Sequence, residues 1–217
     1  MITTPDLIES LVARAKPVRR LRPPAARAAL WLLLAAAIVS LLAISHGLRP
    51  DLGARLGQPL FVTGLAASLL TGVLAAVVAF IVSLPDRSRL WLLLPSPALA
   101  LWVSTIGYGC LSGWVSVRPD GVALGEAADC FATLVLTSVP LWLAMLLMLR
   151  HVALLRSAAA AVAASLAVAA IASTALALFH DLDASVMILM WNLGTAALLV
   201  GLGSVFWERM LSWVASR

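Results

Sequence analysis

The chain alternates long apolar stretches with short polar segments. Six of these stretches contain no Asp, Glu, Lys or Arg. They cover residues 28–45, 60–84, 90–108, 131–149, 157–179 and 185–207. About 20 apolar residues in a helix are enough to cross the ~30 Å hydrocarbon core of a membrane. The pattern therefore predicts an all-α integral membrane protein, built as a bundle of six transmembrane helices.

The composition agrees with this prediction and excludes an ordinary soluble domain. Of the 217 residues, 63% are hydrophobic and 12% are charged, compared with about 45–50% and about 25% in soluble domains. The residues outside the six stretches are too few and too scattered to form a second hydrophobic core. We expect two parts, a tail over residues 1–27 and a six-helix transmembrane domain over residues 28–217.

The basic residues are distributed unevenly among the predicted loops, and this predicts the orientation. With a cytoplasmic N-terminus, twelve Arg and Lys residues fall on the cytoplasmic side, and only Arg49, Arg55 and Arg118 fall on the outer side. Loops rich in Lys and Arg stay in the cytoplasm, so we expect both termini there. Orientation explains the basic clusters better than nucleic-acid binding does, and no direct nucleic-acid partner is expected.

The tail is predicted to form a short cytoplasmic amphipathic helix that is followed by a basic linker. Pro5 suits a first helical turn and Pro17 would end the helix. The apolar face of this helix consists of Leu7, Ile8, Leu11, Val12 and Ala15. Such a face either lies on a membrane surface or docks into a groove of a partner protein. A chain held by six spans gains little from a surface anchor, so we favour the partner. The linker residues Arg19, Arg20 and Arg22 would meet anionic lipid or an acidic partner.

The two cysteines, Cys110 and Cys130, are expected at the outer ends of the third and fourth spans, which we take to be adjacent antiparallel helices. On an oxidising side of the membrane they would form a disulfide, sense oxidants or bind a soft metal. The alternative is a pair of inert, buried thiols. His180, at the outer end of the fifth span, is either a further metal ligand or a polar residue at the membrane interface. No other cofactor is expected.

Small residues, prolines and tryptophans add detail to the spans. Rows of small residues at a spacing of four predict packing faces. They are Gly64, Ser68 and Gly72 in the second span and Ser165, Ala169, Ser173 and Ala177 in the fifth. Pro95 and Pro97 should kink the third span near its cytoplasmic end, and Pro140 should kink the fourth. We assign most of the eight tryptophans to aromatic belts at the two membrane surfaces.

Several segments together resemble one family of regulators. They are the tail from Pro5 to Pro24 with its basic, proline-rich linker, Gly47-Leu48-Arg49-Pro50-Asp51-Leu52 after the first span, Pro85-Asp86-Arg87-Ser88-Arg89 with Trp91, the Gly109-Cys110 step and Cys130. These segments resemble the NrsF-type family of bacterial anti-sigma factors, and the similarity runs over the whole chain.

The resemblance implies a negative regulator in the inner membrane of a bacterium. Such a protein holds an extracytoplasmic-function sigma factor at the membrane and releases it on envelope, heavy-metal or oxidative stress. The resemblance assigns the response to Cys110 and Cys130, and we assign sigma-factor binding to the tail. The tail residues concerned are Leu7, Ile8, Leu11, Val12, Arg19, Arg20 and Arg22. Asp181 follows His180, where some relatives have a third cysteine, so a three-thiol site is not expected.

Two other functions compete with this one. A small transporter or metal-export subunit would need a polar path through the bundle, and a membrane thiol oxidoreductase would need a redox partner. The sequence contains no nucleophile paired with a base, no carboxylate pair in a span and no phosphate-binding loop. We therefore expect no enzymatic activity.

Overall fold

The computed structural model describes residues 22–84, 86–112, 124–149 and 157–179, and in the tail Thr4, Glu9, Val12 and Ala13. Over these ranges the chain is helical and contains no strand. The elements are the α-helices α2 (Pro24–His46), α3 (Leu52–Leu56), α4 (Pro59–Val82), α5 (Ser96–Ser112), α6 (Leu124–Leu149) and α7 (Ser157–Phe179), and the 3-10 helix η1 (Arg89–Leu93). The all-α prediction is confirmed for this part of the chain.

Four helical segments are long and apolar enough to cross a membrane. They are Pro24–Ser45, Pro59–Val82, Arg89–Tyr108 and Ala159–Phe179, which correspond to the first, second, third and fifth predicted spans. The fourth predicted span lies within α6, where the apolar stretch Val135–Leu149 is shorter. The sixth, residues 185–207, lies outside the described residues. The structure therefore supports four candidate spans, and six spans remain a prediction.

Prolines determine where several of these helices begin. Pro24 and Pro59 occupy the first turns of α2 and α4, where a fixed φ and a missing N–H fit well. The first helix consequently begins at Pro24 rather than at residue 28, and Arg27 becomes part of it. Pro95 separates η1 from α5, so the third predicted span is interrupted where expected. Pro140 lies inside α6.

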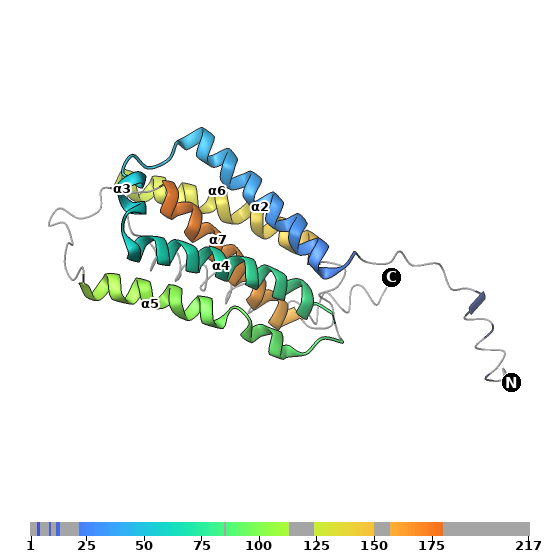
Figure 1. Cartoon of the computed structure of the whole chain (residues 1–217). Coiled ribbons are helices and arrows are strands. Elements are labelled where there is room, and N and C mark those ends of the chain that lie inside the picture. The colour runs from blue at the N-terminus through green and yellow to red at the C-terminus, as the bar shows by residue number, and fades with distance from the viewer. Residues whose placement is uncertain are drawn as a thin grey trace.

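Figure 1 shows α4 and α7 in the middle of the bundle, with α5 along one side and α2 and α6 along the other. The most extensive contact joins α4 to α7, α5 packs on α4, and α2 packs on α4 and α6. The span in α7 is 72% buried, whereas the span in α2 is 17% buried. Helix α7 is thus central and α2 is peripheral.

Small residues bring α4 close to its neighbours, as their spacing predicts. A Cβ atom added to Gly72 would lie 2.8 Å from Cδ1 of Ile171 in α7. One turn away, the hydroxyls of Ser68 and Thr174 share a hydrogen bond of 2.9 Å. Gly64 faces Thr105 of α5. The row in α4 is therefore a packing face for two helices. Ser165, Ala169 and Ser173 of the other row are also buried.

We expect Gly72→Val to destabilise the bundle, because the added side chain meets Ile171. Overpacking of this kind costs about 1–3 kcal/mol. Thermal unfolding of the detergent-solubilised chain measures the loss, and the second change Ile171→Ala should restore part of it. Gly107→Val is the matched control, because a Cβ atom at Gly107 meets nothing within 4 Å. Equal losses at Gly72 and Gly107 would contradict the close contact.

Two of the tryptophans lie in the interior rather than at a surface. Trp31 is completely buried and Trp102 nearly so, so these two are exceptions to the aromatic-belt assignment, which covered most of the eight. Trp31 belongs to the main core together with Phe80, Leu141 and Met145. Trp91, by contrast, is 41% exposed, as expected for a residue at the rim of the bundle.

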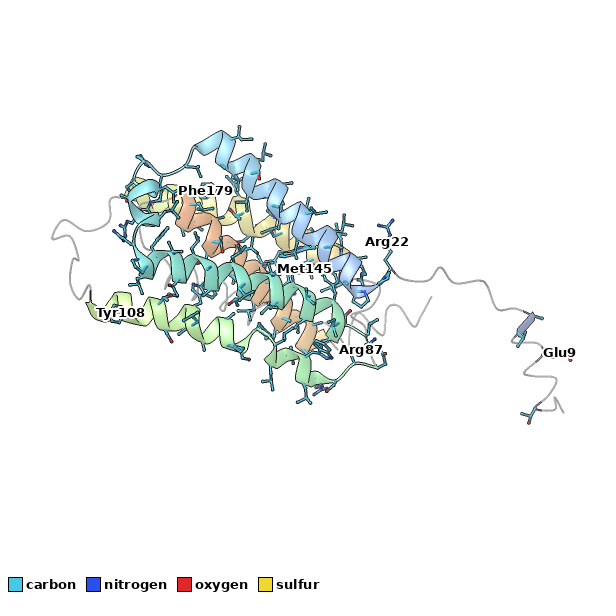
Figure 2. The ribbon with its side chains drawn as sticks, in the orientation of Figure 1. Glu9, Arg22, Arg87, Tyr108, Met145 and Phe179 are labelled. Atoms are coloured by element: carbon cyan, nitrogen blue, oxygen red, sulfur yellow. The ribbon has the colours of Figure 1, made fainter. Side chains whose placement is uncertain are left out.

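The loops alternate between the two ends of the bundle. Figure 2 shows Arg22 and Arg87 at one end and Tyr108 and Phe179 at the other. We call the first the basic end, because Arg22, Arg27, Arg87 and Arg89 lie there, and the second the Asp51 end. Helices α2, α5 and α7 run from the basic end to the Asp51 end, and α4 and α6 run back. This alternation agrees with the predicted order of the loops.

Candidate functional site

The structure describes two of the tail residues that we expect to bind a partner. Val12 has helical backbone and is 70% exposed, and Arg22 is exposed just before α2. Thr4, Glu9 and Ala13 also have helical backbone and are exposed. The remaining predicted residues lie outside the described part of the chain. They are Leu7, Ile8, Leu11, Arg19 and Arg20.

Arg27 joins the start of α2 to the ends of two other helices. Its side chain is buried, its Nη2 donates a hydrogen bond to the carbonyl of Met148, and its guanidinium carbon lies 5.0 Å from the centre of the Phe80 ring. Met148 is in the last turn of α6, where carbonyls have no intrahelical partner and a cation is favourable. Arg27 therefore caps the C-terminal end of α6, in addition to being one of the arginines at the basic end of the bundle.

Trp31 makes a second contact between α2 and α6, one turn after Arg27 in α2. Its Nε1 donates a hydrogen bond of 3.2 Å to the carbonyl of Leu141. Leu141 follows Pro140, which lies inside α6. Because proline has no N–H, the carbonyl of residue 136 lacks its helical hydrogen bond, and α6 is weaker at this point. We call the contacts of Arg27 and Trp31 with α6 the α2–α6 junction.

Sequence reasoning missed this junction. It used Arg27 only as an indicator of topology, and it gave Trp31 no role apart from the aromatic belts proposed for most of the tryptophans. Their spacing of four residues was the available indication, since it places both side chains on one face of a helix. The partners on α6, however, could not be identified from α2 alone.

At the opposite end, Arg49 fixes the loop after α2 to the end of α7. Its side chain is 1% exposed, and it holds Asp51 through two contacts, Nε to Oδ1 at 2.6 Å and Nη2 to Oδ2 at 3.0 Å. The backbone N–H of Arg49 donates to the carbonyl of Leu178 at 3.1 Å, and its Nη1 donates to that of Ala177 at 3.5 Å. The Arg49-Pro50-Asp51 segment thus caps α7 at its C-terminal end.

Asp51 is held in its ionised form by two arginines. The hydrogen bond from Arg49 is the largest influence and lowers the pKa of Asp51 to about 2, desolvation opposes it, and Nε of Arg55 contributes a further hydrogen bond at 3.2 Å. The carboxylate therefore stays charged throughout the physiological pH range. The ion pairs of Asp51 with Arg49 and Arg55 therefore do not respond to pH between 5 and 8 through the Asp51 carboxylate.

The two cysteines lie on helices that are not neighbours in the described bundle (Figure 1), so the expectation of adjacent antiparallel helices is wrong for this part of the chain. Cys110 is near the end of α5, which packs on α4, and Cys130 is near the start of α6, which packs on α7 and α2. Figure 1 shows α5 and α6 on different sides of the α4–α7 pair. The side chains of both cysteines, and His180 altogether, are outside the described residues. Among the residues described, no three His, Cys, Asp or Glu side chains form a metal-binding group.

The comparison with family models identifies the family. Residues 11–213 match the NrsF model, whose description is negative regulator of sigma F. The chain belongs to the NrsF family. Searches of the curated proteins and of the solved structures found no match. The NrsF description makes this chain a negative regulator of a sigma factor, and a sigma factor its partner.

The extent of the NrsF match separates the predicted site residues into two groups. Leu7 and Ile8 precede the match, so they depend on the helical pattern of the tail alone. The others lie within it. They are Leu11, Val12, Arg19, Arg20, Arg22, Cys110, Cys130 and His180. The matched region also contains the whole described bundle, including the α2–α6 junction and the contacts of Arg49 with Asp51 and the end of α7.

Proposed function

We propose that this NrsF chain is a six-span membrane anti-sigma factor. Its tail sequesters an extracytoplasmic-function sigma factor at the inner membrane of a bacterium, and envelope, heavy-metal or oxidative stress releases it. The observation that carries the proposal is the family match over residues 11–213 in a chain with four helices long enough to span a membrane.

The charges at the two ends of the bundle support a cytoplasmic basic end. Arg22, Arg87 and Arg89 are exposed there, and segments rich in Lys and Arg remain in the cytoplasm. The tail joins the bundle at the same end through Arg22 and Pro24. In this orientation the tail lies in the compartment where a sigma factor meets RNA polymerase.

The tail has the properties of a helix that docks into a hydrophobic groove. Val12, from its apolar face, is exposed and available for a partner. Burial contributes about 1.5–3 kcal/mol for each fully buried Leu, Ile or Val, before the cost of ordering the tail and the partner is subtracted. The four large residues of the face, Leu7, Ile8, Leu11 and Val12, therefore suit a complex that is tight yet releasable. Arg19, Arg20 and Arg22 would steer an acidic partner towards it.

The release step is assigned to the outer ends of α5 and α6. Cys110 and Cys130 would respond there to an oxidant or to a soft metal, and no resident cofactor is part of the proposal. The central helices α4 and α7 contain no charged residue, whereas an ion-coupled transport path uses charged side chains within the membrane. This favours a regulator over the transporter alternative.

The decisive experiment compares sigma-factor capture by the full chain and by residues 23–217. We expect the detergent-solubilised full chain to recover a sigma factor from its host and the shortened chain to recover at least tenfold less, because the docking helix is removed. The thermal unfolding midpoint of both chains serves as the control for an intact bundle. Equal recovery by the two chains would place the docking surface outside the tail.

A further inference from the structure

The α2–α6 junction connects the helix that carries Cys130 to the helix that carries the tail. Nε1 of Trp31 donates to the carbonyl of Leu141, and Nη2 of Arg27 donates to the carbonyl of Met148. The two acceptors are seven residues apart, about two turns of α6. The junction therefore holds one face of α2 against the half of α6 that follows Pro140.

Helix α2 packs on α4 as well as on α6, and its contact with α4 is the more extensive. Only Ala28, Trp31 and Ala35 among its apolar residues are buried, and large side chains such as Leu33 and Leu41 are exposed. At the far end, the loop after α2 is held by Arg49 to α7 rather than to α6. Arg27 and Trp31 donate hydrogen bonds from α2 to α6, so a movement of α6 relative to α4 and α7 reaches α2 through these two side chains.

Arg27 makes the connection stiff. Its guanidinium group lies between the last turn of α6 and the Phe80 ring. A charged group in such surroundings is costly when it loses its partner. If Met148 is displaced, the start of α2 must follow it or leave a buried charge unpaired. Arg22 and Pro23 directly precede α2 in the chain, so the same displacement reaches the point at which the tail joins the bundle.

We propose that the α2–α6 junction transmits the state of α6 to the sigma-binding tail, with Arg27 and Trp31 as positioning residues. This inference rests on the proposed function, since it requires a sigma factor on the tail. It adds the route by which an event on α6 changes capture. Coupling between two sites is reciprocal, so capture of the sigma factor by the tail must also change α6.

Reciprocity gives a test that needs no inducer. Hydrogen exchange is measured on the detergent-solubilised full chain, with and without the sigma factor that co-purifies with it. We expect bound sigma factor to slow exchange of the amides of residues 141–149 by about fivefold or more, the lower end of typical couplings. Trp31→Phe, which removes the Nε1 donor, and Arg27→Gln, which removes the charge, should each abolish this slowing while the sigma factor stays bound.

Trp102→Phe is the matched control. Trp102 is a buried tryptophan of α5, in a cluster with Ala67 and Ala170, and its replacement should leave the slowing in α6 unchanged. Exchange in α4 and α7 without the sigma factor reports whether each variant is folded. Bound sigma factor with unchanged exchange in α6 of the unaltered chain would overturn the inference and leave the proposed function intact. Slowing that persists in both junction variants would also overturn it. Failure to recover any sigma factor would contradict the proposed function itself.

Discussion

Replacing both Leu7 and Leu11 by aspartate is expected to abolish repression of the sigma factor. The change removes two apolar side chains that each contribute about 1.5–3 kcal/mol when buried, and it brings two unpaired charges to an apolar groove. A loss of at least about 3 kcal/mol weakens binding more than 100-fold. The chain should still accumulate in the membrane, because the predicted spans follow the tail.

A reporter transcribed by the captured sigma factor measures the effect without added stress. Ser10→Asp combined with Ala13→Asp is the matched control, because it adds the same charge at two tail positions that the helical spacing places outside the apolar face. Full repression by this control and full expression with the leucine variant would support groove docking. Equal expression from the two variants would show that charge in the tail, and not its apolar face, determines capture.

Replacing either Cys110 or Cys130 by serine is expected to abolish induction by stress. A disulfide or a bridging metal requires both thiols, so each single change should have the effect of the double change. Repression without stress should be unchanged, because the cysteines lie on α5 and α6 and the tail precedes α2. Cells treated separately with cadmium chloride and with hydrogen peroxide show which chemistry acts.

Accumulation of the protein in the membrane is the control for the cysteine variants. If Cys110→Ser alone blocks the response to hydrogen peroxide and Cys130→Ser does not, the two residues do not act as a pair. If the double variant responds to both treatments like the unaltered chain, the cysteines are packing residues of α5 and α6.

The helices themselves were predictable from the sequence because a membrane imposes a simple requirement. A chain that crosses hydrocarbon must satisfy its backbone hydrogen bonds within each span, so long uncharged stretches indicate helices. The contact face of α4 was predictable for a related reason. Gly64, Ser68 and Gly72 are small, and small residues mark positions where helices approach closely.

The two ends of the bundle were less predictable. The uncharged stretch begins after Arg27, so the pattern excluded that residue from the helix, although its charge is satisfied by Met148 in another helix. Tryptophan is typical of membrane interfaces. Trp31 nevertheless lies in the core, where the carbonyl of Leu141 accepts its N–H. The Arg49-Pro50-Asp51 segment was recognised as a motif, but its attachment to α7 required the tertiary structure. Both arginines depend on acceptors that are remote in sequence.

That remoteness has a consequence for the synthesis of the protein. The acceptors used by Arg27 and by Nη1 of Arg49 lie 121 and 128 positions later in the chain. At a translation rate of about 5–20 residues per second, Arg27 and Arg49 are made roughly 6–26 seconds before the carbonyls that accept their hydrogen bonds. Helix α2 can pack on α4 before then, but the contacts that hold Arg27 to α6 and Arg49 to α7 form only after α6 and α7 have been made. Synthesis that stops within this interval leaves Arg27 without its acceptor on α6, so the last contacts of α2 depend on completion of the second half of the bundle.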